Sequence, residues 1–156
     1  MKFNTKLLHG KAGRNTPDGA TLPGISQVSA FSYDSAEHLE KVFGNKAPGF
    51  AYTRIGNPTV AAFEQRINEV EGGTGAIACA SGMAAITVAL LNVLSAGDEI
   101  IAGSGLFGGT IDLFKDLEAF GITTHFIPHI TVEDIKPVLN QNIKAVFGGL
   151  LYTSDA

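Results

Sequence analysis

The stretch Ala76–Ile86, which reads A-I-A-C-A-S-G-M-A-A-I, decides the fold. Ala76–Ala80 is a short apolar run with the length of a buried strand, and Ser81-Gly82-Met83 has the character of a turn. From Ala84 onward no helix breaker occurs before Ser95, so we expect a buried helix there. The stretch therefore predicts a strand that turns directly into a helix.

The turn at Ser81 and Gly82 has the chemistry of an anion site. The first N–H groups of a helix have no partner within the helix, and the helix dipole adds partial positive charge. Ser81 can cap the helix or donate its hydroxyl, and Gly82 lets a ligand approach the backbone closely. A phosphate fits such a turn. Strand-turn-helix junctions are common in α/β proteins, however, so this stretch alone favours Ser81 as only an N-cap on a core helix.

The composition places the chain among globular proteins. Its 156 residues are 45% hydrophobic and 17% charged, which suits one domain with a sizeable core. A net charge of −4 without a basic run argues against nucleic acid as the main partner. The start lacks the apolar core of a signal peptide, and Ala84–Val93 is too short to span a bilayer. We therefore expect a cytoplasmic protein with no membrane partner.

The remaining chain alternates helix and strand signals. The first 24 residues, rich in Gly and Pro, predict an extended arm. We expect helices at 34–43 (with capping-box spacing from Asp34), 58–71, 84–94, 110–120 and 131–139, and strands at 27–33, 76–80, 99–102, 122–127 and 143–147. From Ala76 the order is β-α-β-α-β-α-β, which predicts an α/β fold with a mostly parallel sheet and flanking helices.

A glycine loop, Gly103-Ser104-Gly105-Leu106-Phe107-Gly108, follows one of these strands and reads G-x-G-x-x-G. That pattern is a dinucleotide-binding fingerprint when its context fits. Here no Asp or Glu ends the next strand, and a whole βα unit precedes the loop, whereas the fingerprint opens the first one. A glycine-rich turn that allows close helix packing explains the loop better than a nicotinamide site does.

Tyr52 and Arg54 stand two residues apart in a loop. A guanidinium fork beside a phenol hydroxyl can clamp an oxyanion, although most loop arginines are simply surface residues. The four histidines show no usable metal-ligand spacing, and no nucleophilic triad order or carboxylate pair stands out. The residues alone thus identify no catalytic group and no metal site.

In combination these pieces resemble a known family. Tyr52–Thr59, Y-T-R-I-G-N-P-T, resembles the Y-S-R-x-x-N-P-T motif of the pyridoxal 5'-phosphate (PLP) enzymes of cysteine and methionine metabolism. This is the family of cystathionine γ-synthase, methionine γ-lyase and O-acetylhomoserine sulfhydrylase. Ser81–Ile86 matches its S-G-M-A-A-I phosphate loop, and Leu106–Thr110 is similar to its L-Y-G-G-T. The resemblance covers residues 3–148 and is closest to the sulfhydrylase and methionine γ-lyase branches.

The resemblance implies fold type I, the aspartate aminotransferase-like architecture, with PLP bound between subunits of a dimer or tetramer. Ser81, Gly82 and Met83 would then bind the cofactor phosphate, and Phe107, where the family has Tyr, would stack on the pyridine ring. Tyr52 and Arg54 would reach the phosphate of the neighbouring subunit's cofactor. Residues 1–57 would form an N-terminal arm and loop segment, and residues 58–156 a partial PLP-binding α/β domain.

The family also implies the reaction class: γ-replacement or γ-elimination on O-acylhomoserine or sulfur amino acids. After Gly148 the sequence departs from the family's E-T-P-S-N-P-like segment, and none of its lysines lies in the Ser-x-x-Lys context of the Schiff-base lysine. We therefore expect a truncated or frameshifted N-terminal part, inactive alone, with no catalytic residue of its own. Alternatives are a non-catalytic PLP- or phosphate-binding fragment, an assembly partner, or a nicotinamide-dependent oxidoreductase.

Overall fold

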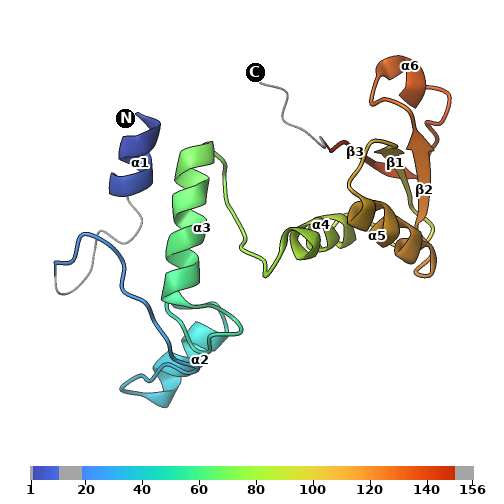
Figure 1. The fold of residues 1–156 in the computed structure, drawn as a ribbon. Coiled ribbons are helices and arrows are strands. Elements are labelled where there is room, and N and C mark those ends of the chain that lie inside the picture. Colours follow the sequence, from blue (N-terminus) through green and yellow to red (C-terminus); the bar gives the residue numbers. More distant parts are fainter. Residues whose placement is uncertain (1, 11–18, 150–156) are drawn as a thin grey trace. The chain divides into compact units, whose positions relative to one another are not determined.

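The computed structural model describes residues 2–10 and 19–149 (Figure 1). The chain divides into two compact units, residues 1–78 and 79–156, and each is treated by itself. The sequence analysis instead places a boundary after residue 57, where the expected PLP-binding domain begins. That division stays a prediction. None of the described helices is long and apolar enough to cross a membrane.

The first unit contains two helices that begin close to the predicted positions. Helix α2 (Ala36–Phe43) is capped by Ser35, whose Oγ accepts a hydrogen bond from the His38 N–H at 3.2 Å. The cap therefore lies one residue after the predicted Asp34. Helix α3 (Pro58–Glu71) is capped by Asn57 and ends at Gly72 in the left-handed conformation, φ +70°, as the sequence indicates.

A third helix, α1 (Phe3–His9), replaces the start of the predicted extended arm. It lies beside α3, as Figure 1 shows. Arg66 of α3 donates from Nη1 to the carbonyl oxygens of Lys6 (2.9 Å), which also accepts the Gly10 N–H, and of Leu7 (3.0 Å) in the last turn of the short helix. The prediction is wrong over residues 3–9 because this support comes from a distant element. Residues 11–18 of the predicted arm lie outside the described residues.

The predicted strand at 27–33 is reduced to one antiparallel bridge between Ala30 and Tyr52. The Phe31 N–H donates to the Ala51 carbonyl at 3.1 Å, and the Thr53 N–H donates to the Ser29 carbonyl at 2.9 Å. Pairing stops there because the chain after Tyr52 turns away instead of continuing as a strand.

The second unit contains the predicted parallel sheet with flanking helices. Strands β1 (Glu99–Gly103), β2 (Thr123–Ile127) and β3 (Ile143–Phe147) pair in the order β2-β1-β3, all parallel. Helices α4 (Gly82–Leu91), α5 (Gly108–Glu118) and α6 (Val132–Ile135) precede the three strands in turn. The central strand β1 has an apolar sequence, and its residues Ile100, Ile101 and Ala102 are completely buried. This pattern is typical of a strand that is covered on both faces of a parallel sheet.

Aromatic packing between α5 and the sheet forms the centre of the core. Phe114 is fully buried, and its ring meets that of Phe147 edge to face at 5.2 Å between centroids. The surrounding cluster of buried residues comprises Leu90, Leu94, Ile100, Ala102, Leu106, Leu117 and Ile122. The core therefore joins the C-terminal end of α4, helix α5 and the sheet.

The predicted strand Ala76–Ala80 does not form. Among the described residues, none of β1 to β3 pairs with it, and Ile77 is 80% exposed. A strand needs a neighbour to satisfy its backbone, and the small Ala and Cys side chains bury too little surface to hold the segment otherwise. The Ala78 N–H of this segment instead donates to Glu64 Oε1 at 2.8 Å.

Several helix boundaries also differ from prediction. Helix α4 begins at Gly82 and not at Ala84, and it ends at Leu91 and not at Leu94. Helix α5 begins at Gly108 after Phe107, whose backbone is extended, so Thr110 lies within the first turn instead of capping it. Thr131 caps α6 as predicted, but that helix ends at Ile135 and not at Leu139. Pro137 explains the early end because proline lacks an N–H and cannot donate to the carbonyl four residues before it.

Candidate functional site

The start of α4 presents backbone N–H groups to open space. Ser81 is the N-cap, and its Oγ accepts a hydrogen bond from the Ala84 N–H at 3.1 Å. Within the described part of the chain, the N–H groups of Gly82 and Met83 donate to no backbone carbonyl. A Cβ placed on Gly82 would meet no atom within 4 Å, so the space above these groups is accessible. This geometry fits a phosphate oxygen.

Ser81 can cap the helix and donate a hydrogen bond to an anion at the same time. A serine hydroxyl has two acceptor lone pairs and one hydrogen. The cap bond to Ala84 uses one lone pair and leaves the hydrogen available to donate to an anion. Ser81 can therefore hold the helix end and contact a ligand at the same time.

The starts of α4 and α5 meet at a contact between Met83 and Thr110. Thr110 is only 4% exposed, and its Oγ1 lies 4.0 Å from Met83 Sδ. A Cβ on Gly109 would come within 3.2 Å of the Phe107 ring and 3.8 Å of Met83 Sδ. A side chain at Gly109 would therefore crowd the Phe107 ring, and Met83 lies on the same side of this glycine. The sequence reasoning missed the roles of Gly109 and Thr110, although both belong to the L-F-G-G-T motif.

Phe107 offers a free aromatic face at this place. It is 66% exposed, while the neighbouring helix turn is held by buried Thr110. An exposed ring on a fixed backbone can stack on a planar heteroaromatic ligand. The structure thus brings Ser81, Gly82, Met83 and Phe107 together in the second unit.

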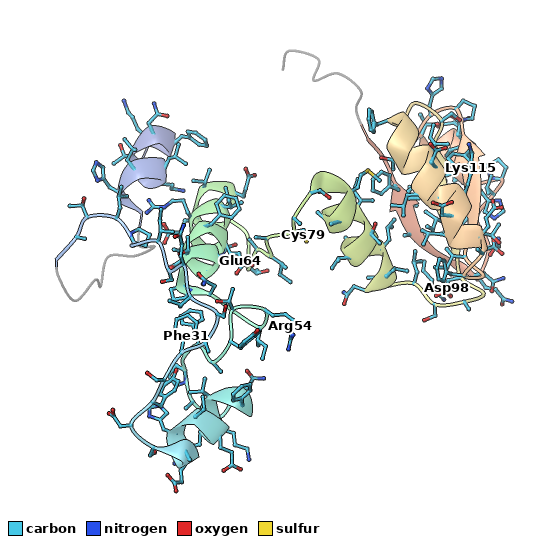
Figure 2. The ribbon with its side chains drawn as sticks, turned by 60° about the horizontal axis from the view of Figure 1, so that its bottom comes forward. Phe31, Arg54, Glu64, Cys79, Asp98 and Lys115 are labelled. Atoms are coloured by element: carbon cyan, nitrogen blue, oxygen red, sulfur yellow. The ribbon has the colours of Figure 1, made fainter. Side chains whose placement is uncertain are left out.

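Tyr52 and Arg54 lie in the first unit, where they form a stacked pair. The Arg54 guanidinium carbon is 5.1 Å from the centre of the Tyr52 ring. Figure 2 shows the Arg54 side chain projecting from its loop, and the described residues place no carboxylate within ion-pairing distance of it. An arginine held this way keeps its donors available for an oxyanion.

A cavity of about 330 Å³ opens at the carboxyl ends of the strands. Gly103 ends β1, Pro128 follows β2, and Gly148 follows β3; the other lining residues are Gly105, His129, Ile130 and Gly149. Ligands of parallel α/β sheets bind at this edge. The Gly103–Gly108 loop therefore lies where a ligand is expected, and His129 is the ionisable residue among those lining the cavity.

A polar cluster ties the strands together at the opposite edge. The Glu99 carboxylate accepts from Asn140 Nδ2 at 2.8 Å and Asn142 Nδ2 at 3.3 Å, and it contacts His125 Nε2 at 2.6 Å. These contacts, with the Asn140 hydrogen bond as the largest, lower the pKa of the Glu99 carboxyl below its ordinary value. The cluster is structural and lies apart from the cavity.

The parallel sheet with its flanking helices is shared with solved structures of PLP-dependent enzymes of fold type I, as the sequence predicts. Residues 4–149 match the model of the Cys/Met metabolism PLP-dependent enzyme family. The chain belongs to that family, which confirms the predicted resemblance. The match places the Gly103–Gly108 loop in a PLP-dependent family and not in a nicotinamide-dependent one.

Two curated proteins and one solved structure are among those similar to this chain. Homocysteine synthase of Schizosaccharomyces pombe is 39% identical over 93% of this chain and 34% of its own length. O-acetyl-L-homoserine sulfhydrylase of Corynebacterium glutamicum is 39% identical over 94% and 34%. A Campylobacter jejuni structure assigned as an O-acetylhomoserine (thiol)-lyase, which contains N'-pyridoxyl-lysine-5'-monophosphate, superposes with a TM-score of 0.86 at 32% identity, over 94% of this chain and 36% of that one. The chain spans about a third of the length of the curated relatives that it matches.

Proposed function

We propose that this chain supplies a cofactor-phosphate site of a PLP-dependent enzyme of the transsulfuration type. The observation that carries the proposal is the open first turn of α4, where Ser81, Gly82 and Met83 present a hydroxyl and two N–H groups to accessible space. The family membership of residues 4–149 supports PLP as the ligand of that turn.

Each proposed residue has a defined task. Ser81, Gly82 and Met83 donate hydrogen bonds to the phosphate, and the α4 dipole favours its negative charge. Phe107 stacks on the pyridine ring and excludes water from one face. PLP, when bound, supplies an electron sink for carbanion chemistry on an amino acid. Among the proposed site residues none is assigned a catalytic role.

Tyr52 and Arg54 serve a second cofactor in this proposal. They would contact the phosphate of the PLP in a neighbouring subunit, so the intact enzyme would be a homo-oligomer, a dimer or tetramer. Exposure of the stacked pair at the surface of the first unit supports such a reach. The substrates would be O-acylhomoserine or sulfur amino acids, which react by γ-replacement or γ-elimination in the cytoplasm. The names of the homocysteine synthase and the sulfhydrylase relatives favour replacement.

The test uses a ligand that cannot react with lysines. 4-Deoxypyridoxine 5'-phosphate lacks the aldehyde of PLP, so its binding reports the phosphate and ring contacts alone. We expect the 156-residue chain to bind it at least tenfold more tightly than 4-deoxypyridoxine, because a charge-assisted hydrogen bond contributes about 1.5–3 kcal/mol. Equal binding of the two compounds would refute the proposed phosphate site.

A pair of matched variants separates ligand contact from helix capping. Ser81→Ala and Ser35→Ala each remove a serine that caps a helix through its hydroxyl oxygen. Both should lower stability by about 1 kcal/mol, but only Ser81→Ala should weaken binding of the phosphate compound. Similar losses of affinity in the two variants would mean that Ser81 acts only as a cap.

A further inference from the structure

The loop that carries Tyr52 and Arg54 is held through the residue between them. Thr53 donates its hydroxyl to the Val28 carbonyl and accepts a hydrogen bond from Asn57 Nδ2 at 3.1 Å. Its N–H donates to the Ser29 carbonyl at 2.9 Å. Because Tyr52 and Arg54 adjoin Thr53 on either side, fixing this residue fixes the direction in which both neighbouring side chains leave the backbone.

Asn57 does more than cap helix α3. Its Oδ1 accepts the Thr59 N–H at 2.8 Å, which is all that capping requires. Its Nδ2 group donates twice more, to the Ser26 carbonyl at 3.0 Å and to Thr53 Oγ1. At 5% exposure the side chain is buried with its three hydrogen-bonding groups engaged. Serine or threonine would cap the helix equally well, as at α2 and α6, so the amide hydrogens serve the loop.

The backbone between Thr53 and Asn57 is closed by its own turn. The N–H groups of Ile55 and Gly56 both donate to the Tyr52 carbonyl, at 2.9 and 3.0 Å. Tyr52 is therefore anchored by its carbonyl and Thr53 by its side chain, while the Tyr52 ring and the Arg54 guanidinium remain at the surface and stack on each other. The anchored carbonyl and hydroxyl and the two stacked side chains thus all belong to the three consecutive residues 52–54.

We propose that Asn57, acting through the hydroxyl of Thr53, is the positioning residue that holds the Tyr52–Arg54 stack ready for a phosphate-type oxyanion. This inference rests on the proposed function of that pair. An arginine loses several rotamers when it binds, and a fork recognises an oxyanion only in a narrow range of directions. A loop locked in advance removes part of that cost from the binding step.

The test compares four variants of the full 156-residue chain. Asn57→Ser keeps an oxygen cap but removes the amide donors, and Thr53→Val removes the hydroxyl at nearly constant shape. Thr53→Ser keeps the hydroxyl and should behave as the wild type. Thr59→Val is the matched control, because it removes a neighbouring hydroxyl that bonds Ser26 and Gly24 without touching the Asn57–Thr53 contact.

The first measurement is the NMR ring-current shift that the Tyr52 ring imposes on the Arg54 side-chain protons, with Tyr52→Leu as the zero reference. We expect Asn57→Ser and Thr53→Val to lose most of this shift, and Thr53→Ser and Thr59→Val to keep it. A merely structural role for Asn57 would lower the melting temperature without moving the shift. An unchanged shift in folded Asn57→Ser and Thr53→Val, judged by their backbone amide spectra, would overturn the proposal.

The second measurement is the affinity for 4-deoxypyridoxine 5'-phosphate. We expect Asn57→Ser and Thr53→Val to weaken it about tenfold, the factor for one charge-assisted hydrogen bond. If the wild-type chain shows no preference for the phosphate compound, the proposed function fails, while the ring-current shift still decides whether Asn57 positions the stack. If the shift falls and the phosphate affinity stays, the positioning for an oxyanion is refuted.

Discussion

Phe114 is the residue whose truncation should cost the second unit most. Its side chain is completely buried between α5 and the sheet, and its ring contacts Phe147 edge to face at 88°. Removal of a buried phenyl ring costs about 3–5 kcal/mol, of which the aromatic pair accounts for about 0.5–1.5 kcal/mol. Small domains have about 5–15 kcal/mol in total. We therefore expect Phe114→Ala to remove a large part of the stability of this unit.

Urea denaturation followed by far-UV circular dichroism measures this loss, and amide hydrogen exchange assigns it to β1 and α5. The matched control is Phe120→Ala, which removes the same ring just after α5, where it is 69% exposed. That control should change the free energy of unfolding by less than about 0.5 kcal/mol. The reasoning fails if the two variants are equally stable.

A double-mutant cycle then isolates the ring pair. Phe114→Leu and Phe147→Leu keep most of the apolar volume and remove the edge-to-face geometry. The coupling free energy should be about 0.5–1.5 kcal/mol in favour of the pair. Additive effects would show that Phe114 contributes only through burial.

Three further predictions concern charge, backbone and ligand. Hydrogen bonds, chiefly from Asn140, lower the pKa of the Glu99 carboxyl. The stabilisation that Glu99 contributes is therefore present above its ordinary pKa of 4.5 and is lost as the pH falls through the pKa of the folded state. The melting temperatures of the wild type and Glu99→Gln should converge in acid, and a difference that stays constant with pH would contradict this. Gly72→Ala should cost about 1 kcal/mol in urea denaturation because φ is +70°, and Gly72→Asn less, since asparagine tolerates this conformation. Arg54→Gln should weaken binding of 4-deoxypyridoxine 5'-phosphate about tenfold, whereas Lys46→Gln, at another exposed cation, should leave it unchanged.

Signals that act within a few residues could be read from the sequence. The caps at Asn57, Ser81 and Thr131 depend on one side chain reaching an N–H two or three residues away, and all three form as predicted. The strands β1 to β3 follow from apolar runs that the sheet buries. Local chemistry therefore specifies most element starts in this chain.

Features that depend on distant partners could not be read. Helix α1 forms where an arm is expected, with support from Arg66, which donates to the Lys6 and Leu7 carbonyls in its last turn. The apolar run at Ala76–Ala80 has the composition of a strand but lacks a paired neighbour among the described residues. Within the site the motifs indicate Ser81 and Phe107, but only the fold shows that Thr110 joins the two helix starts.

Asn57 and Ser81 show how the use of hydrogen-bonding groups separates positioning residues from ligand residues. Both cap a helix through a side-chain oxygen. Asn57 is buried, and its Nδ2 group donates both hydrogen bonds inside the protein, to the Ser26 carbonyl and to Thr53 Oγ1. Ser81 is exposed, keeps its hydroxyl hydrogen, and stands beside the N–H groups of Gly82 and Met83, which donate to no backbone carbonyl of the described residues. Because a saturated cap can only orient its surroundings while an unsaturated one can still bind, Asn57 is expected to act through Thr53 and Ser81 directly on the anion.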